Sequence, residues 1–326
     1  MSPPVNVGKG FFVGALLTMA GQNLGERSKL TIWIMAMRPK TLILSIAPVI
    51  LAGLLAFEGL HPVDWWVFPI ILVSATSIQI ATNLWNDAAD AKSGLDQASE
   101  RLGPPRMSSL GLLSVNRVRM AAVLFLALSA LCGLYLVIYG GWPILLIGIV
   151  GIVCAFGYSS GPYPISGSPF GEIFVIVFFG IMSVMGSYFL LTGEWTQLSF
   201  WSGVYIGFPA AAVLTVNNHR DRVGDKEGGR RTLAILLGPE RTKQLYAVLI
   251  LVSCVGLIHI SNLLTHGVLN LASLLITFAI MLFALLVPIR KMFLAATPIE
   301  HIKNLMRTSM FQFVWIIAFF AIQMFS

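Results

Sequence analysis

Long apolar stretches alternate with short polar connections along almost the whole chain. Each long stretch is close to the roughly 20 residues that a helix needs to cross the hydrocarbon core of a bilayer. The stretches cover residues 30–57, 65–91, 115–138, 142–158, 170–192, 198–221, 240–261, 267–289 and 306–325. The pattern predicts an all-α polytopic membrane protein with nine transmembrane helices.

The composition supports a membrane location. Apolar residues make up 57% of the 326 residues and charged residues only 11%, whereas a soluble domain has about 25% charged residues. This excludes a disordered chain, a soluble enzyme and a collagen-like chain. The net charge of +7 is better explained by basic cytoplasmic loops than by nucleic-acid binding, so we expect no nucleic-acid partner.

The distribution of basic residues predicts the topology. With the N-terminus inside, all 21 Lys and Arg residues fall in inward-facing segments, although the loop after the fourth stretch has none. By the positive-inside rule the N-terminus is cytoplasmic and the C-terminus is periplasmic or outside. We therefore expect a multi-pass protein of the cell membrane (inner or plasma) whose cytoplasmic face carries the polar chemistry.

The N-terminal segment, residues 1–28, is interpreted separately. Its short apolar run at residues 10–20 could be a signal peptide, but no A-x-A cleavage site follows it and Arg27 and Lys29 resume a basic stretch. An uncleaved interfacial segment is favoured, followed by one transmembrane domain over residues 29–326.

Five of the six Asp residues lie at the predicted cytoplasmic ends of the second and sixth stretches. Carboxylates at a membrane boundary are functional candidates because they are costly to place there. In each cluster Asn and Asp recur every three or four residues, which puts them on one face of a helix. The clusters consist of Asn83, Asn86, Asp87 and Asp90, with Asp96 beyond, and of Asn217, Asp221 and Asp225.

These side chains provide the hard oxygen ligands that Mg²⁺ prefers. The sequence therefore predicts a Mg²⁺ site shared by the two clusters, and the alternative is helix capping or ion pairs with the loops. The candidate ligands are Asn86, Asp87, Asp90, Asn217, Asp221 and Asp225.

Basic, glycine-rich loops follow both clusters. Lys and Arg beside Asp-bound Mg²⁺ suit a diphosphate, although each of them could instead set topology or anchor at the interface. The candidate diphosphate-binding residues are Arg38, Lys40, Arg101, Arg106, Lys226, Arg230 and Arg231.

The segment 157–172 is an inner loop rich in Gly, Pro and Ser and without Lys or Arg. Such a loop can cover a ligand, and its reactive side chains are Tyr158, Tyr163 and Glu172. Glu172 could equally interact with the N-terminus of the following helix. The candidate catalytic residues are Asp90, Asp221, Asp225, Tyr158 and Glu172. The five histidines have no metal spacing and are interpreted as structural.

With these motifs, residues 30–325 resemble the UbiA superfamily of membrane prenyltransferases. That family has nine helices and two NxxxDxxxD motifs; here the second is complete, and the first has Gly94 in place of its last Asp. The displaced form NDxxDxxxGxD at 86–96, followed by RxGPxR at 101–106, resembles the MenA branch, the 1,4-dihydroxy-2-naphthoate polyprenyltransferases.

The resemblance implies the reaction. A polyprenyl chain passes from polyprenyl diphosphate to 1,4-dihydroxy-2-naphthoate, CO₂ and diphosphate leave, and demethylmenaquinone forms. Mg²⁺ held by Asn86, Asp90, Asp221 and Asp225 would act as the Lewis acid, with Asp87 and Asn217 assisting.

Three alternatives remain at this stage. A UbiA-type enzyme could use another aromatic acceptor, such as 4-hydroxybenzoate. A cation-coupled transporter would place its acids near the bilayer midplane, whereas here they lie beside Arg-rich loops. A CDP-alcohol phosphotransferase would need a DGxxAR signature, which the sequence lacks.

Overall fold

The computed structural model describes residues 27–57, 63–93, 106–158, 164–265 and 271–324, and every regular element in these ranges is helical. This confirms the all-α prediction. In chain order the elements are α2 (Lys29–Met37), α3 (Pro39–Phe57), α4 (Val67–Ser93), α6 (Val115–Gly157), the 3-10 turn η1 (Ile165–Gly167), α7 (Gly171–Val175), the π-helix η2 (Ile176–Met182), α8 (Ser183–Thr192), α9 (Gln197–Glu227), α10 (Leu233–Leu264), α11 (Leu271–Ala284), the π-helix η3 (Leu285–Ile289), α12 (Arg290–Leu294) and α13 (Pro298–Met324).

Eight helices among the described residues are long and apolar enough to cross a membrane. One of them, α6, has 43 residues and is two helices merged across a kink at Gly141, where φ is 62° and ψ is −152°. Val118, near its start, shares a hydrophobic cluster with Ala88 of α4, and Phe156, near its end, packs on Trp85 of α4 with ring centroids 4.8 Å apart. Since both ends of α6 lie beside the same end of α4, α6 doubles back on itself.

The first predicted stretch, 30–57, is wrong as a single helix. It divides into α2 and α3 at Arg38, whose backbone is left-handed with φ 54° and ψ 64°. Pro39 starts α3, and a proline disfavours the α-conformation of the residue before it while fitting the first position of a helix. This break places Arg38 at the junction between the two helices.

Several other helices extend past the apolar stretches that predicted them. α9 continues to Glu227 rather than 221, and α13 begins at Pro298 rather than 306. In α10 a break at Gly238, where φ is 75°, separates a short first piece from the long helix that starts at Pro239, close to the predicted 240. Polar helical turns are invisible to a hydropathy criterion, because they are stabilised by hydrogen bonds and caps instead of by apolar burial. The extension of α9 keeps Asp225 within the helix.

The π-helix η2 lies very close to α9. A Cβ at Gly203 would be 2.8 Å from Cα of Ile181, and a Cβ at Gly180 would collide with the carbonyl oxygen of Gly203. Small residues allow membrane helices to approach this closely. The contact fixes the register between η2 and the α9 face that carries the second acidic motif.

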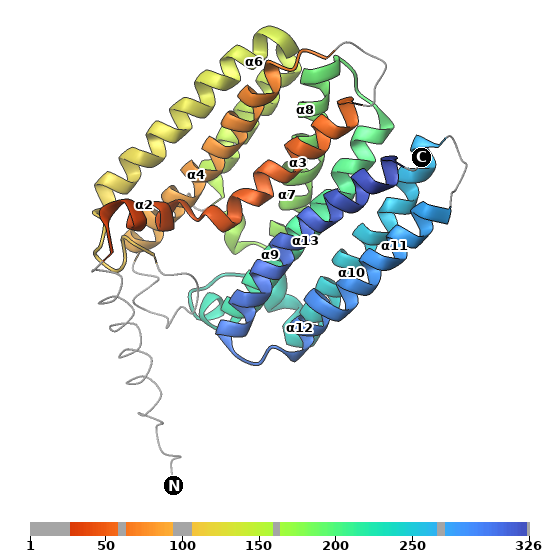
Figure 1. The fold of residues 1–326 in the computed structure, drawn as a ribbon. Coiled ribbons are helices and arrows are strands. Elements are labelled where there is room, and N and C mark those ends of the chain that lie inside the picture. The colour runs from red at the N-terminus through yellow and green to blue at the C-terminus, as the bar shows by residue number, and fades with distance from the viewer. Residues whose placement is uncertain (1–26, 58–62, 94–105, 159–163, 266–270, 325–326) are drawn as a thin grey trace.

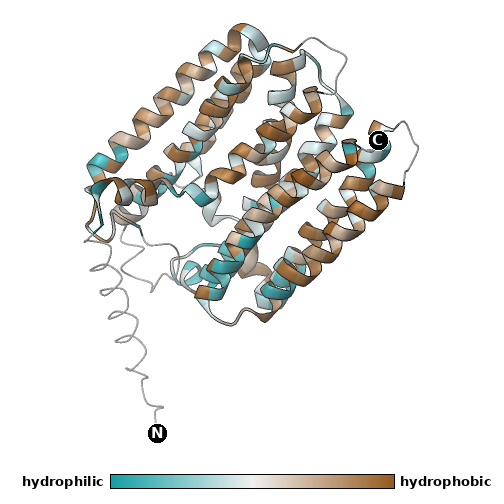
Figure 2. Ribbon diagram, in the orientation of Figure 1, coloured by the Kyte–Doolittle hydropathy of each residue, from teal (hydrophilic) through white to brown (hydrophobic). Residues whose placement is uncertain are grey.

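Figure 1 shows the arrangement of the helices. α10, α11 and α13 lie on one side, α4 and α6 on the other, and α3 between them. In Figure 2 hydrophobic colour runs along the helices, and hydrophilic colour gathers at their lower ends, around α2 and the lower end of α13. Large apolar side chains also cover the outside, such as Ile138 and Leu275 with 78% and 59% of their surface exposed. An apolar outer surface of this kind suits lipid contact.

Candidate active site

A cavity of about 580 Å³ lies between α3, α4, α6, the α7–η2–α8 segment and α9. Its polar end contains residues from both acidic motifs, since Asn86 of α4 and Asn217 and Asp225 of α9 all line it. Arg38, Arg106 and Arg230 line the same end. The cavity therefore joins amide and carboxylate oxygens to three cationic side chains.

On α9, Arg220 connects the first two members of the motif. Its guanidinium donates to both carboxylate oxygens of Asp221, each at 2.7 Å, and to Oδ1 of Asn217 at 2.6 Å. The Arg220 and Asp221 side chains are only 2% and 4% exposed. Such a bidentate contact fixes the orientation of the carboxylate.

Asp225 is held by the turn that follows α9. Arg230 donates through a guanidinium nitrogen to Oδ1 of Asp225 at 2.9 Å, and its backbone N–H donates to the Asp225 carbonyl at 2.9 Å. Gly229 permits the turn with a φ of 77°. The next residue, Arg231, donates its backbone N–H to the carbonyl of Gly167 at 2.8 Å, which attaches the η1 loop to this turn.

On α4, Asp87 has a structural contact that the sequence did not indicate. It is 1% exposed, and its two oxygens accept the backbone N–H groups of Met107 and Ser108, each at 3.0 Å. The neighbouring Arg106 donates to the backbone carbonyl of Asn86. The Asp87 carboxylate thus anchors the turn that brings Arg106 to the cavity.

Asn83, one turn earlier on α4, connects that helix to the break between α2 and α3. Its amide donates to the carbonyl of Met37 and to the hydroxyl of Thr41, both at 3.0 Å. Because Met37 directly precedes Arg38, this contact helps to place Arg38 on the cavity wall.

Glu172 and Tyr158 lie near each other at the side of the polar end. Glu172 is 3% exposed and accepts from the amide of Asn218, which lines the cavity, at 3.0 Å. Tyr158 directly follows the last residue of α6 and lines the cavity. The phenol of Tyr158 can donate a hydrogen bond into the cavity.

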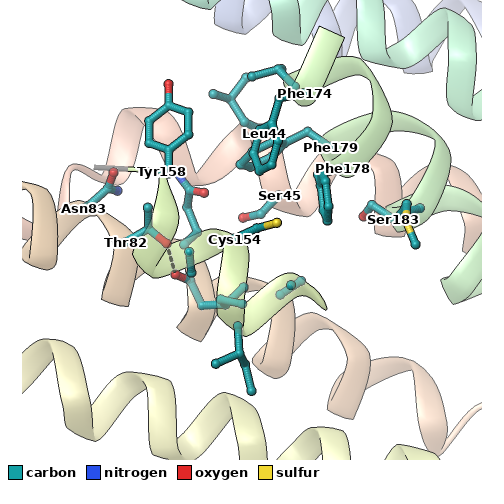
Figure 3. Close-up of a pocket in the computed structure, with 18 of the residues that line it drawn as sticks. Leu44, Ser45, Thr82, Asn83, Cys154, Tyr158, Phe174, Phe178, Phe179 and Ser183 are labelled. Atoms are coloured by element: carbon teal, nitrogen blue, oxygen red, sulfur yellow. Dashed lines mark hydrogen bonds between the residues drawn. The ribbon is translucent and has the colours of Figure 1, made fainter. Parts of the chain in front are cut away.

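The rest of the cavity is mainly apolar and aromatic, with a few Ser and Gln side chains in its wall. Phe174 and Phe178 stack with centroids 4.4 Å apart and an interplanar angle of 25°. Figure 3 shows Asn83 and Tyr158 toward one end of the pocket and Phe178 and Ser183 toward the other, with Phe174 and Phe179 along the wall. The cavity is therefore amphipathic, with one polar end and one long apolar part.

The structure brings together about half of the residues that the sequence suggested. Seven of them line the cavity, namely Arg38, Asn86, Arg106, Tyr158, Asn217, Asp225 and Arg230. Asp87, Glu172 and Asp221 do not line it. Asp87 is hydrogen-bonded to the turn at Met107 and Ser108, Glu172 to the cavity residue Asn218, and Asp221 is connected to the cavity residue Asn217 through Arg220. Lys40, Lys226 and Arg231 are exposed and are not among its wall residues. Arg101, Tyr163 and the Asp90 side chain lie outside what the structure describes.

Three residues near the site had no role in the sequence interpretation. Arg220 was assigned only to topology, although its i, i+3 spacing from Asn217 places both on one side of a helix and could have revealed the contact. Asn218 and Phe178 gave no comparable signal, because an adjacent amide and one of 21 phenylalanines do not stand out in an apolar chain.

The donor set at the polar end fits Mg²⁺. No three His, Cys, Asp or Glu side chains come together to form a metal site within the described residues. Mg²⁺, however, usually binds one or two carboxylates and completes its shell with water and substrate phosphate oxygens. The Asp225 carboxylate and the amide oxygens of Asn86 and Asn217 at this end match that pattern, since a carboxylate has about four acceptor positions and can serve a cation and an arginine together.

Comparison with known proteins decides the family. Residues 45–317 match the UbiA prenyltransferase family. The chain belongs to this family. It is therefore a membrane prenyltransferase with several membrane-crossing helices, which excludes the transporter and CDP-alcohol phosphotransferase alternatives.

Curated members of the family resemble the chain along most of its length. The 1,4-dihydroxy-2-naphthoate octaprenyltransferase of Mycobacterium tuberculosis is 36% identical over 68% of this chain and 75% of its own length. The Escherichia coli protein of the same name is 33% identical over 72% of this chain and 79% of its own. The resemblance to the MenA branch is thus supported by sequence identity as well as by motif.

Solved structures support the UbiA fold. A UbiA homologue from Archaeoglobus fulgidus bound to GPP and Mg²⁺ has a TM-score of 0.62 at 16% identity, covering 89% of this chain and 99% of its own. The apo homologue from Aeropyrum pernix K1 has a TM-score of 0.61 at 17% identity, with 89% and 98% covered. The family includes members that bind a prenyl diphosphate together with Mg²⁺.

Proposed function

We propose that the protein transfers a polyprenyl chain from polyprenyl diphosphate to 1,4-dihydroxy-2-naphthoate. The observation that supports this most directly is the amphipathic cavity, where Asn86 of one motif and Asn217 and Asp225 of the other line the same polar end. A prenyl diphosphate matches this cavity, because its anionic head suits the polar end and its apolar tail suits the apolar part. The curated relatives named for this reaction, at 36% and 33% identity, support the choice of acceptor.

In this proposal the arginines bind the diphosphate. Arg38, Arg106 and Arg230 converge from three separate parts of the chain on the polar end. Planar guanidinium groups suit diphosphate oxygens because they can donate two parallel hydrogen bonds. Charge stabilisation on the leaving group is the main catalytic contribution we expect from these side chains.

The metal ligands are proposed to come from both motifs, and Mg²⁺ when bound would supply Lewis-acid neutralisation of the leaving diphosphate. Asp87 is not in the proposed set, because its carboxylate holds the turn at Met107 and Ser108. Asp221 is kept, because it shares the face of α9 that carries Asn217 and Asp225, which line the cavity. Arg220 orients the side chains of Asp221 and Asn217, which we propose as metal ligands. The proposed ligands are Asn86, Asp90, Asn217, Asp221 and Asp225.

The aromatic wall would protect the allylic cation. Phe174 and Phe178 line the cavity, and their stacked rings offer π-faces to a cation. An apolar, water-poor wall also limits hydrolysis of the cation.

The acceptor would lie near Tyr158 and Asn218. Tyr158 donates a hydrogen bond to an acceptor oxygen, and Glu172 holds the Asn218 amide in a fixed orientation. The allylic C–O bond breaks with its electron pair on diphosphate, and a ring carbon bonds to the allylic carbon. The ring then loses a proton, and its carboxyl group leaves as CO₂ and is replaced by hydrogen. The product is demethylmenaquinone at the quinol level.

We further propose nine membrane crossings, with the two arms of α6 each crossing once. The N-terminus and the polar end of the cavity would face the cytoplasm of a cell membrane, as the distribution of basic residues indicates. Residues 1–28 would lie at the interface, and residues 29–326 would form the single prenyltransferase domain.

The test is a product assay with purified protein in lipid nanodiscs. Octaprenyl diphosphate and Mg²⁺ are supplied with 1,4-dihydroxy-2-naphthoate or with 4-hydroxybenzoate, and the products are identified by mass. We expect the prenylated, decarboxylated naphthoquinol and no benzoate product. Transfer to 4-hydroxybenzoate alone would assign the protein to a different acceptor, and no transfer to either would refute the proposal.

A further inference from the structure

Among the described residues, the wall of the cavity is exposed in one region. Among the described residues that line it, four are exposed, and all four belong to α6. They are Leu134 on the first arm, 60% exposed, and Leu145, Gly148 and Ile149 on the second, of which Leu145 is 41% and Ile149 51% exposed. The other described wall residues are buried or half-buried. The opening is therefore in the wall formed by the two arms of α6.

Two glycines lie at this opening. Gly133 and Gly148 both line the cavity, and a Cβ at either position would have no neighbouring atom within 4 Å. They precede and follow the kink at Gly141 by eight and seven residues. At 1.5 Å per residue both lie roughly 10–12 Å from the kink. They are thus at a similar depth on the two arms, and neither has a side chain to narrow the space.

The length of the cavity limits how much tail it can hold. Its wall along α4 extends from Asn86 at the polar end to Ser74, which at 1.5 Å per residue is about 18 Å. A geranyl chain of two isoprene units fits within this length, whereas an octaprenyl chain of eight units does not when extended. The distal part of a long tail must leave the cavity, and it can leave without an energetic cost only into lipid.

We propose that the distal part of a long polyprenyl tail leaves between the two arms of α6, and that Gly133 and Gly148 are specificity-determining residues that admit long tails. This rests on the proposed prenyl transfer and adds the path and the residues that set chain length. The exposed side chains of Leu134, Leu145 and Ile149 supply an apolar rim, which suits the passage of an apolar tail from protein to lipid.

The test compares chain lengths in variants that fill the opening. Gly133→Trp and Gly148→Trp are assayed with geranyl and with octaprenyl diphosphate. We expect geranyl transfer within about twofold of wild type and a loss of at least about tenfold in kcat/KM for octaprenyl diphosphate, since pocket obstruction discriminates on this scale. The controls are Leu131→Trp and Leu146→Trp, at neighbouring positions that are 65% and 53% exposed but do not line the cavity. These should leave both activities unchanged.

A binding measurement keeps the inference testable if the Trp variants do not fold. In Gly148→Cys, labelling by N-ethylmaleimide is read at residue 148 by mass spectrometry. We expect octaprenyl diphosphate with Mg²⁺ to slow this labelling at least about fivefold and geranyl diphosphate to leave it unchanged.

The outcomes separate the two proposals. Equal protection by both diphosphates, or octaprenyl transfer that survives both Trp substitutions, would overturn the path through α6. Failure of the wild-type protein to prenylate any naphthoate would refute the proposed function, while the labelling result would still report where a bound tail lies.

Discussion

The contacts of Asp87 indicate a structural role, in contrast to the carboxylates that we propose as metal ligands. Its two oxygens accept N–H groups of Met107 and Ser108 at 3.0 Å, and the side chain is 1% exposed. A hydrogen bond to a charged group contributes about 1.5–3 kcal/mol. Asp87→Ala removes two of them and leaves two buried donors unsatisfied, so we expect a loss of about 3–6 kcal/mol in local stability of the turn that holds Arg106. Asp87→Asn keeps one acceptor oxygen and should lose about half as much.

The assay measures stability and metal dependence in parallel. Unfolding is followed by titrating a denaturing detergent into micelles, and the Mg²⁺ concentration for half-maximal prenyl transfer is measured for each variant. For Asp87→Asn we expect lower stability and an unchanged Mg²⁺ requirement, whereas the matched variant Asp225→Asn should raise the Mg²⁺ requirement and lose little stability. Wild-type stability together with a raised Mg²⁺ requirement in Asp87→Asn would show that Asp87 is a metal ligand and that our interpretation of its contacts is wrong.

Three further predictions concern the metal site and the packing of α9. Asp221→Asn and Asp225→Asn should each lower kcat by roughly 10²–10³, as expected for lost electrostatic stabilisation, and full activity in both would contradict the metal site. Excess chelator should abolish product formation and added Mg²⁺ should restore it; product made at the same rate in chelator would argue against metal dependence. Gly203→Ala places a Cβ 2.8 Å from Cα of Ile181 and should destabilise the protein by about 1–3 kcal/mol, whereas Gly133→Ala, with open space around it, should not; equal stability of the two would refute the close contact.

The sequence alone indicated the class and the family, and it predicted the chemical type of the site. Apolar stretches of membrane-crossing length predict helices, because a backbone in lipid must satisfy its own hydrogen bonds, and every regular element in the described part of the chain is helical. The 3.6-residue period also placed Asn217, Asp221 and Asp225 on one face of a helix, and all three lie within α9. The helix break at Arg38 could have been predicted from Pro39, because a proline disfavours the helical conformation of the residue before it. The hydropathy pattern alone does not show it.

The tertiary structure decided which polar residues act together. The partners of Asp87 are 20 and 21 residues away in sequence, and no periodicity links them. The same is true of Glu172 and Asn218, which are 46 residues apart. Contacts of this kind depend on how helices pack, and a pattern along one helix contains no information about the distance to another.

The shape of the cavity is likewise a tertiary property. Periodicity shows which face of a helix is apolar, but Leu134 and Ile149 are equally apolar whether they face lipid, a core or a substrate. Only the packing of the two α6 arms against α4 shows that they border an open space. Local sequence fixes the backbone hydrogen bonds and the faces of each helix, whereas cavities arise from the space that several helices leave between them.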